Sequence, residues 1–298
     1  MKLSSLLVTI AVVASWGLNA AIGKMGVMEV PPQAFLAIRF VIAGLLFLPF
    51  ARVNKKQLKF LLLIALLLNV GHMGCIFIAL KYLPASSASV LQQCEVPMAL
   101  IVAWLFAGEK ISLRQVYGII TAFAGILCIF GIPELNAVGF SAALAAGLFW
   151  ALTQLAFKRA PHFSAASFLA YTSLFSVPFL VLTSYLFEKV SLETFSAAGG
   201  RFYFSMAYQV LVLGVAMMMW QRVVAENGIN KVAPFTLLHI IFGIMGGMIF
   251  FDERLNPYII AGAFLIIVGV ALTTLKKAPA WRCWLQKWRQ HPLFYRHH

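Results

Sequence analysis

The stretch WGLNAAIGK at residues 16–24 returns as WALTQLAFK at residues 150–158, with Trp, Leu and Lys in register at an offset of 134 residues. A second match, at an offset of 144 residues, joins the turn at 108–110 to the turn at 252–254. A longer loop at about 188–204 accounts for the ten extra residues. The chain therefore contains two copies of one unit.

Composition predicts where this unit lies. Hydrophobic residues make up 62% of the 298 residues and charged residues only 11%. Apolar runs near the length of a bilayer crossing recur almost from end to end. We therefore expect an all-α polytopic membrane protein with ten transmembrane helices. The expected spans are 5–23, 32–50, 58–80, 87–107, 114–131, 138–157, 165–187, 205–225, 233–251 and 257–275.

The ten spans divide into two inverted five-helix repeats, at 1–131 and 138–275, followed by a basic aromatic tail at 276–298. Because five is odd, the second repeat enters the bilayer in the opposite sense to the first. Inverted repeats allow two equivalent arrangements that open a central site to one side and then to the other. The start of the chain also resembles a cleaved signal peptide, but the return of its first helix at Trp150 argues against cleavage.

Basic residues predict the orientation, because Lys and Arg near helix ends are retained in the cytoplasm. Of the 23 basic residues, 17 fall on one side, so both termini should be cytoplasmic. The net charge of +14 then reflects topology, and no nucleic-acid partner is expected. In the tail, Trp281, Trp284 and Trp288 suit either a helix on the anionic leaflet or a disordered basic segment that enforces orientation.

The four cysteines show no paired spacing, so neither a disulfide nor a metal site is expected, and no cofactor is implied. The chain also lacks the GxxxxGK[ST] motif of ATP-driven pumps. Gly118 with Gly125, and Gly262 with Gly269, are seven residues apart and share a helix face. Small residues allow close helix packing, within the chain or against a second subunit of a homodimer.

Glu95 is the first candidate functional residue. It lies eight residues into its expected span, about 12 Å below the membrane surface. Ionisable groups at such depth are costly and usually functional. Its mate in the second repeat is His239, 144 residues further on. We expect Glu95 to carry a coupling proton, with His239 relaying it or binding a substrate carboxylate. The alternatives are a neutral, hydrogen-bonded Glu95 and a His239 used only for packing.

Other polar residues fall inside the spans. Arg39 could clamp a substrate carboxylate with paired hydrogen bonds, or form a structural pair with Glu95 or with helix-end carbonyls. Gln92 and Gln93 precede Glu95 by a turn or less. His72 and the methionines at 217–219 are expected to pack or to line a cavity. The remaining candidates for substrate binding or proton coupling are Asn19, Gln154, Trp16, Trp150 and Thr236.

These features resemble the EamA family of the drug/metabolite transporter superfamily. The likeness is carried by WGLN with Lys24, the PP at 31–32, IRF at 38–40, AGEKIS at 107–112, FWALTQLAFKR at 149–159, KVAP at 231–234 and DERL at 252–255. It extends to exporters of cysteine and O-acetylserine through WGLN, KVAP and the Gln92 region. A proline usual in the ninth helix is replaced near His239.

The resemblance implies a multi-pass protein of the bacterial inner membrane that exports amino acids or related metabolites and uses the proton gradient. The nearest rival is an exporter of lipophilic or cationic compounds, favoured by the 14% aromatic content and by an acidic Glu95. An intramembrane enzyme of lipid chemistry is the remote alternative. It would need acidic, His or Ser groups converging at one membrane face, whereas the nine acidic residues are scattered through short loops.

Overall fold

The computed structural model describes residues 2–131, 135–228 and 232–274. Within these ranges, nine helices are long and apolar enough to cross a membrane, and a tenth apolar helix, Phe235–Phe251, is shorter. Each of the ten expected spans coincides with one of these helices. The prediction of an all-α polytopic membrane protein is therefore confirmed. The tail at 276–298 lies outside the described residues.

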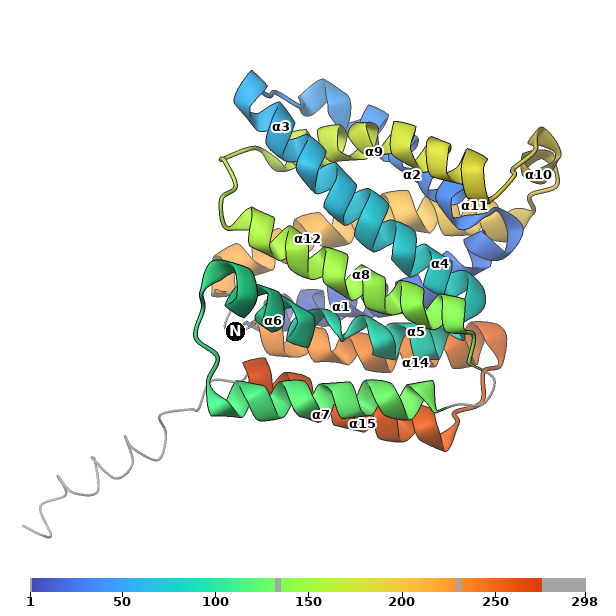
Figure 1. The fold of residues 1–298 in the computed structure, drawn as a ribbon. Coiled ribbons are helices and arrows are strands. Elements are labelled where there is room, and N and C mark those ends of the chain that lie inside the picture. The colour runs from blue at the N-terminus through green and yellow to red at the C-terminus, as the bar shows by residue number, and fades with distance from the viewer. Residues whose placement is uncertain (1, 132–134, 229–231, 275–298) are drawn as a thin grey trace, which may run out of the picture.

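The first half forms five spans (Figure 1). They are α1 (Leu3–Glu29); α2 (Pro32–Phe47) with η1 (Leu48–Phe50); α3 (Lys55–Ile64) with η2 (Ala65–Met73) and α4 (Gly74–Tyr82); α5 (Ala85–Gln92) with α6 (Glu95–Ala107); and α7 (Leu113–Phe130). Local sequence explains several ends. Asn54 and Ser112 begin α3 and α7 with capping boxes, and Gly108 ends α6 at φ 65°, a conformation that favours glycine.

The second half repeats this order. Its elements are α8 (Ala137–Phe157); α9 (Ala165–Phe187); α10 (Leu192–Ser196); α11 (Gly200–Ala207) with η3 (Tyr208–Val212) and α12 (Leu213–Asn227); η4 (Ala233–Leu237) with α14 (Leu238–Phe251); and α15 (Pro257–Thr274). The expected long loop holds the short helix α10. The eighth span begins at Gly200, earlier than the expected residue 205.

The third and fourth spans of both halves depart from regular α-helix. The third spans contain the π-helical segments η2 and η3, a feature frequent at functional sites. The fourth spans change geometry just before Glu95 and His239, where α6 and α14 begin. In the first half Pro97 explains the break, because its ring clashes with the carbonyl of residue 93 and it has no N–H to donate there. Such interruptions expose polar backbone groups inside a membrane protein.

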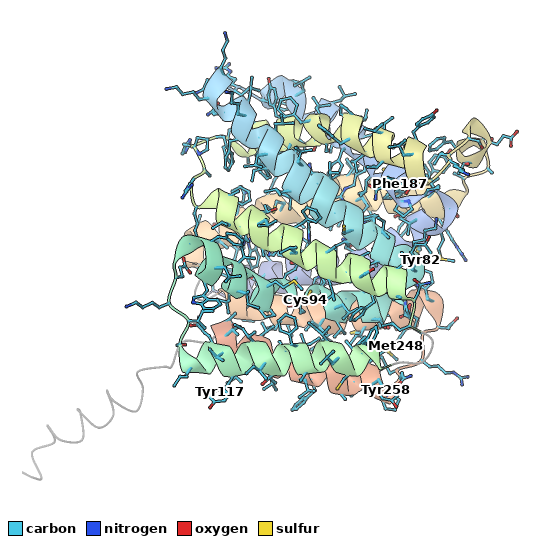
Figure 2. All side chains as sticks on the ribbon, viewed as in Figure 1. Tyr82, Cys94, Tyr117, Phe187, Met248 and Tyr258 are labelled. Atoms are coloured by element: carbon cyan, nitrogen blue, oxygen red, sulfur yellow. The ribbon has the colours of Figure 1, made fainter. Side chains whose placement is uncertain are left out.

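Helices from the two halves pack against each other. α7 lies along α15, α2 along α9, α1 along α14 and α8 along α6. In Figure 1, α7 and α15 form one edge of the molecule and α2, α3 and α9 the other, with α1, α6, α8 and α14 between them. Large apolar side chains such as Tyr117 and Phe187 are exposed around this bundle (Figure 2). An apolar outer surface suits contact with lipid.

Glycines set the distance between α7 and α15. A Cβ added to Gly118 would lie 2.7 Å from the Gly269 carbonyl oxygen, and one added to Gly125 would lie 2.6 Å from the Gly262 carbonyl oxygen. These contacts show that the two helices run antiparallel. The 144-residue offset relates Gly118 to Gly262 and Gly125 to Gly269. Replacing both glycines of one contact by their repeat mates therefore gives the other contact. The two glycine faces therefore pack against each other within one chain.

We expect Gly125→Ala to destabilise the protein by about 1–3 kcal/mol, because the new methyl group would overlap backbone atoms of α15 that cannot move independently. The measurement is the free energy of unfolding in detergent micelles. Gly214→Ala is the matched control, since no heavy atom lies within 4 Å of its added Cβ. Equal stability of both variants would contradict the close glycine packing.

Lys24 and its repeat mate Lys158 lie at opposite ends of the bundle. The turns at 83–84 and 252–256 lie at one end, here called the Lys24 end, beside Tyr82 and Tyr258 in Figure 2. The turns at 108–112 and 158–164 lie at the other, the Lys158 end, which also carries the N-terminus. These two ends are the two sides from which a central site could be reached.

Candidate functional site

Glu95 lies at the centre of the candidate site. It is the first residue of α6, and the preceding Cys94 lies between the two ends of the bundle in Figure 2. Its Oε1 is buried without a hydrogen-bond partner in the described structure and lies 3.8 Å from His72 Nε2. Gln92 lies within hydrogen-bonding reach of the same carboxyl group. The N-terminal end of α6 favours a negative charge at this position.

The orientation of His72 suits proton exchange with Glu95. Its Nδ1 lies 3.1 Å from the carbonyl oxygen of Ala146, so this nitrogen carries a proton and donates it. In the neutral ring, Nε2 is then the free acceptor, and it faces Glu95. At 3.8 Å the two atoms are beyond direct hydrogen-bond distance, so a proton would pass between them through a bridging water or after a small side-chain movement.

A cavity of about 330 Å³ lies near this pair, although neither Glu95 nor His72 lines it. Trp150 lines the cavity and packs against His72, with ring centroids 5.1 Å apart. Val96, the neighbour of Glu95, also lines it, as does Gln154. The cavity extends to Glu109 and Lys158, which are 55% and 42% exposed. The cavity therefore opens at the Lys158 end of the bundle.

His239 belongs to a different cluster. Its Nδ1 lies 3.4 Å from Gln93 Nε2, and its ring approaches the backbone of Trp16. Trp16 in turn packs against Trp220, with ring centroids 4.9 Å apart. Thr236 lies on η4, three residues before His239.

The two clusters change the expected pairing of Glu95. Sequence pairs it with His239, but in the described residues Glu95 makes its ion-pair contact with His72, and His239 contacts the amide of Gln93. Gln92 and Gln93 accordingly serve different clusters. From its position in the sequence, His72 was expected only to pack or to line a cavity. The signal that applied to Glu95, an ionisable residue deep in an apolar span, was also present at His72.

Arg39 forms neither of the structural pairs considered from sequence. Its guanidinium carbon lies 5.2 Å from the Phe40 ring centroid and 6.0 Å from that of Phe77. In the described part of the chain, Nη1 is buried without a hydrogen-bond partner, and no carboxylate lies within ion-pair distance. A buried cation of this kind is costly unless an anion joins it.

A polar contact missed from sequence lies near the middle of α1. Gln209 on η3 donates from Nε2 to Asn19 Oδ1, while its own Oε1 is buried and has no partner among the described residues. The position of a Cβ on Gly23 would be 3.2 Å from Gln209 Nε2 and 3.4 Å from Phe77. Gln209, Asn19 and the ring beside Arg39 therefore lie around one junction. Gln209 was detectable as a polar residue within an apolar span.

The site brings together two titratable side chains and several hydrogen-bonding groups. In the described ranges no three His, Cys, Asp or Glu side chains are grouped to hold a metal ion. Glu95 and His72 are titratable side chains near the cavity, while Gln154 offers an amide on its wall and Arg39, elsewhere, has no counter-ion among the described residues. This chemistry suits binding and release of a small polar molecule.

Comparison with known proteins gives the family. The model of the EamA-like transporter family matches residues 3–131 and 137–275. The uncharacterized transporter YvbV of Bacillus subtilis is 28% identical over 276 residues, with 89% of each chain covered. Probable amino-acid metabolite efflux pumps of Salmonella typhimurium and Escherichia coli are 26% identical over 274 residues, covering 87% of this chain and 91% of theirs.

A solved crystal structure shares the fold, with a TM-score of 0.55 and 21% identity, and the match covers 92% of this chain and 98% of that one. Similarity therefore extends over nearly the whole length in both sequence and fold. Because the family model matches both halves of the sequence, the chain belongs to the EamA-like transporter family and is a transporter rather than an enzyme.

Proposed function

We propose that this protein is a proton-coupled secondary transporter that exports amino acids or related small metabolites by alternating access. The observation that carries the proposal is the buried pair of Glu95 and His72 beside a cavity that reaches one end of the bundle. Intramembrane acids and histidines next to a substrate path are the usual parts of proton relays. Two relatives are also named as probable efflux pumps.

Alternating access is supported by the relation between the two halves. We infer that residues 1–131 and 138–275 are inverted repeats, because α7 and α15 are antiparallel and exchange their glycine contacts under the 144-residue offset. The interrupted fourth spans and the π-helical third spans recur in both halves. Two equivalent halves can exchange conformations and so open the cavity to either side in turn.

Membrane orientation follows from the basic residues. Arg52, Lys55, Lys110, Arg114 and Lys158 lie at the Lys158 end. We propose that this end faces the cytoplasm of a bacterial inner membrane and that both termini lie there. The cavity then opens toward the cytoplasm, where an exporter collects its substrate.

The substrate class rests on two features. Two relatives are probable amino-acid metabolite efflux pumps, and Arg39 is a buried cation that lacks a counter-ion in the described structure. A substrate carboxylate would supply the missing charge through paired hydrogen bonds. Asn19 and Gln209, at the same junction, offer amide groups for a zwitterion.

Transport in proteoliposomes under an imposed pH gradient tests the proposal. The panel contains cysteine, O-acetylserine, neutral and aromatic amino acids, and a lipophilic cation. We expect amino acids or their derivatives to accumulate at least about tenfold further with a gradient of about one pH unit than without it, because one proton moving down that gradient supplies about 1.4 kcal/mol. Movement that ignores the gradient would contradict proton coupling.

One observation favours a second function. The cavity wall is largely apolar, with Val96, Leu100, Trp150 and Leu155 among its residues. Such a wall suits a lipophilic cation that exchanges with the proton of Glu95. In the same panel, movement of the cation alone would establish a drug exporter in place of a metabolite exporter.

A further inference from the structure

Lys24 and Glu253 join the two halves at the Lys24 end. Their Nζ and Oε1 atoms lie 3.8 Å apart, and the two side chains are only 15% and 11% exposed. Lys24 Nζ also donates to the Leu83 carbonyl oxygen at 2.5 Å and lies 5.3 Å from the centroid of the Phe251 ring. A single cation thus holds α1, the turn before α5 and the end of α14 together.

Glu253 makes further bonds across the same boundary. Its Oε1 accepts from the Ala85 backbone N–H at 2.6 Å, and its Oε2 accepts from the Ser86 backbone N–H at 3.0 Å and from Ser86 Oγ at 2.6 Å. A carboxylate from the second half therefore caps α5 of the first half, where the helix dipole favours a negative charge.

The mate of this pair lies at the opposite end. Lys158 is the repeat mate of Lys24, and Glu109 is the mate of Glu253. Lys158 Nζ donates to Glu109 Oε1, so the same two positions form an ion pair again. In the described structure, however, the side chain of Glu109 accepts from Lys158 alone, and both residues border the cavity. One pair is enclosed at a sealed end, and the other is exposed at an open end.

The sealed pair is also connected with the proton site. α5 begins at Ala85, where Glu253 caps it, and ends at Gln92, which lies beside Glu95. The helix spans only eight residues, from one site to the other. A movement of its Gln92 end on proton transfer would therefore change the hydrogen bonds at its Ala85 end.

We propose that Lys24 and Glu253 form a latch that keeps the Lys24 end closed while the cavity is open at the Lys158 end. Lys158 and Glu109 close the opposite end when the halves exchange conformations. The inference rests on the proposed alternating access and names the residues that position each closed state. Opening toward the Lys24 end requires Glu253 to leave the N-terminus of α5. The exposed pair of Lys158 and Glu109 at the other end does not oppose this opening.

Thiol labelling tests the latch without any substrate. Ala99, which lines the cavity, is replaced by cysteine in a full-length chain whose four native cysteines are changed to alanine. A membrane-impermeant maleimide is then applied from either side of oriented membrane vesicles. We expect the parent to be labelled from the Lys158 end. Glu253→Gln should raise the labelling rate from the Lys24 end at least about tenfold, or about 1.4 kcal/mol in the closed-state equilibrium.

Lys24→Gln is the second variant and should shift labelling in the same direction, so the test survives if Glu253→Gln fails to fold. Glu226→Gln is the matched control, because Glu226 pairs with Arg222 on its own helix, and it should leave labelling from the Lys24 end unchanged. Labelling of the parent from both ends at one rate, or parent-like labelling of both latch variants, would overturn the latch. Transport of nothing in the substrate panel would overturn only the proposed function, because labelling does not depend on it.

Discussion

Glu95→Gln is expected to lower gradient-driven transport by about 100-fold or more, while substrate exchange across the membrane continues. The amide keeps the size and hydrogen-bonding capacity of the side chain but cannot take a proton from His72. The roughly 2.7 kcal/mol per proton that a gradient of about two pH units supplies, a factor of about 100, is therefore lost. The measurement compares net uptake under a pH gradient with exchange of labelled for unlabelled substrate in proteoliposomes.

Glu226→Gln is the control for this variant, because Glu226 is half-exposed and pairs only with Arg222 on the same helix. It should transport as the parent does. His72→Gln should reduce gradient-driven transport in the same way as Glu95→Gln if the two side chains share one proton. Full coupling in His72→Gln together with lost coupling in Glu95→Gln would leave Glu95 as the carrier and assign His72 to packing.

Arg39→Gln should raise the KM for a carboxylate substrate by about 30-fold or more. Removing one partner of a buried charged pair costs about 2–5 kcal/mol. In the described structure no protein carboxylate pairs with Arg39, so a bound substrate carboxylate would be its counter-ion. The measurement is the concentration dependence of transport for an amino acid and for its uncharged amide.

The comparison of acid with amide separates binding from structure. If Arg39 holds the carboxylate, the parent prefers the acid and Arg39→Gln loses that preference. If Arg39 only packs on Phe40 and Phe77, both substrates are affected equally, which would contradict a binding role. Arg201→Gln is a suitable control because Arg201 is an exposed residue at the Lys24 end.

Much of the architecture was predictable from sequence. Apolar length alone indicated ten spans, and the spacing of Gly118, Gly125, Gly262 and Gly269 indicated close packing of the fifth and tenth helices. Both are local properties: a run of apolar residues needs a membrane, and a stripe of small residues lies on one helix face whatever surrounds it. The depth of Glu95 followed in the same way from its position along its span.

Partners were less predictable than positions. The offset that relates Glu95 to His239 identifies equivalent places in two halves, and equivalent places under a two-fold relation need not touch. The structure instead brings His72 to Glu95 from another span and leaves Arg39 with aromatic neighbours. Periodicity along one helix carries no information on which residue of another helix faces it.

The sequence by itself determined the membrane class and the identity of the ionisable residues within the apolar segments, and it predicted ten spans in two repeats. Only the tertiary structure decided that His72 faces Glu95, that Glu253 caps α5, and that one Lys–Glu pair is enclosed while its mate is exposed. The reason is physical: span and spacing depend on neighbours along the chain, whereas burial and pairing depend on how the helices of the two halves cross.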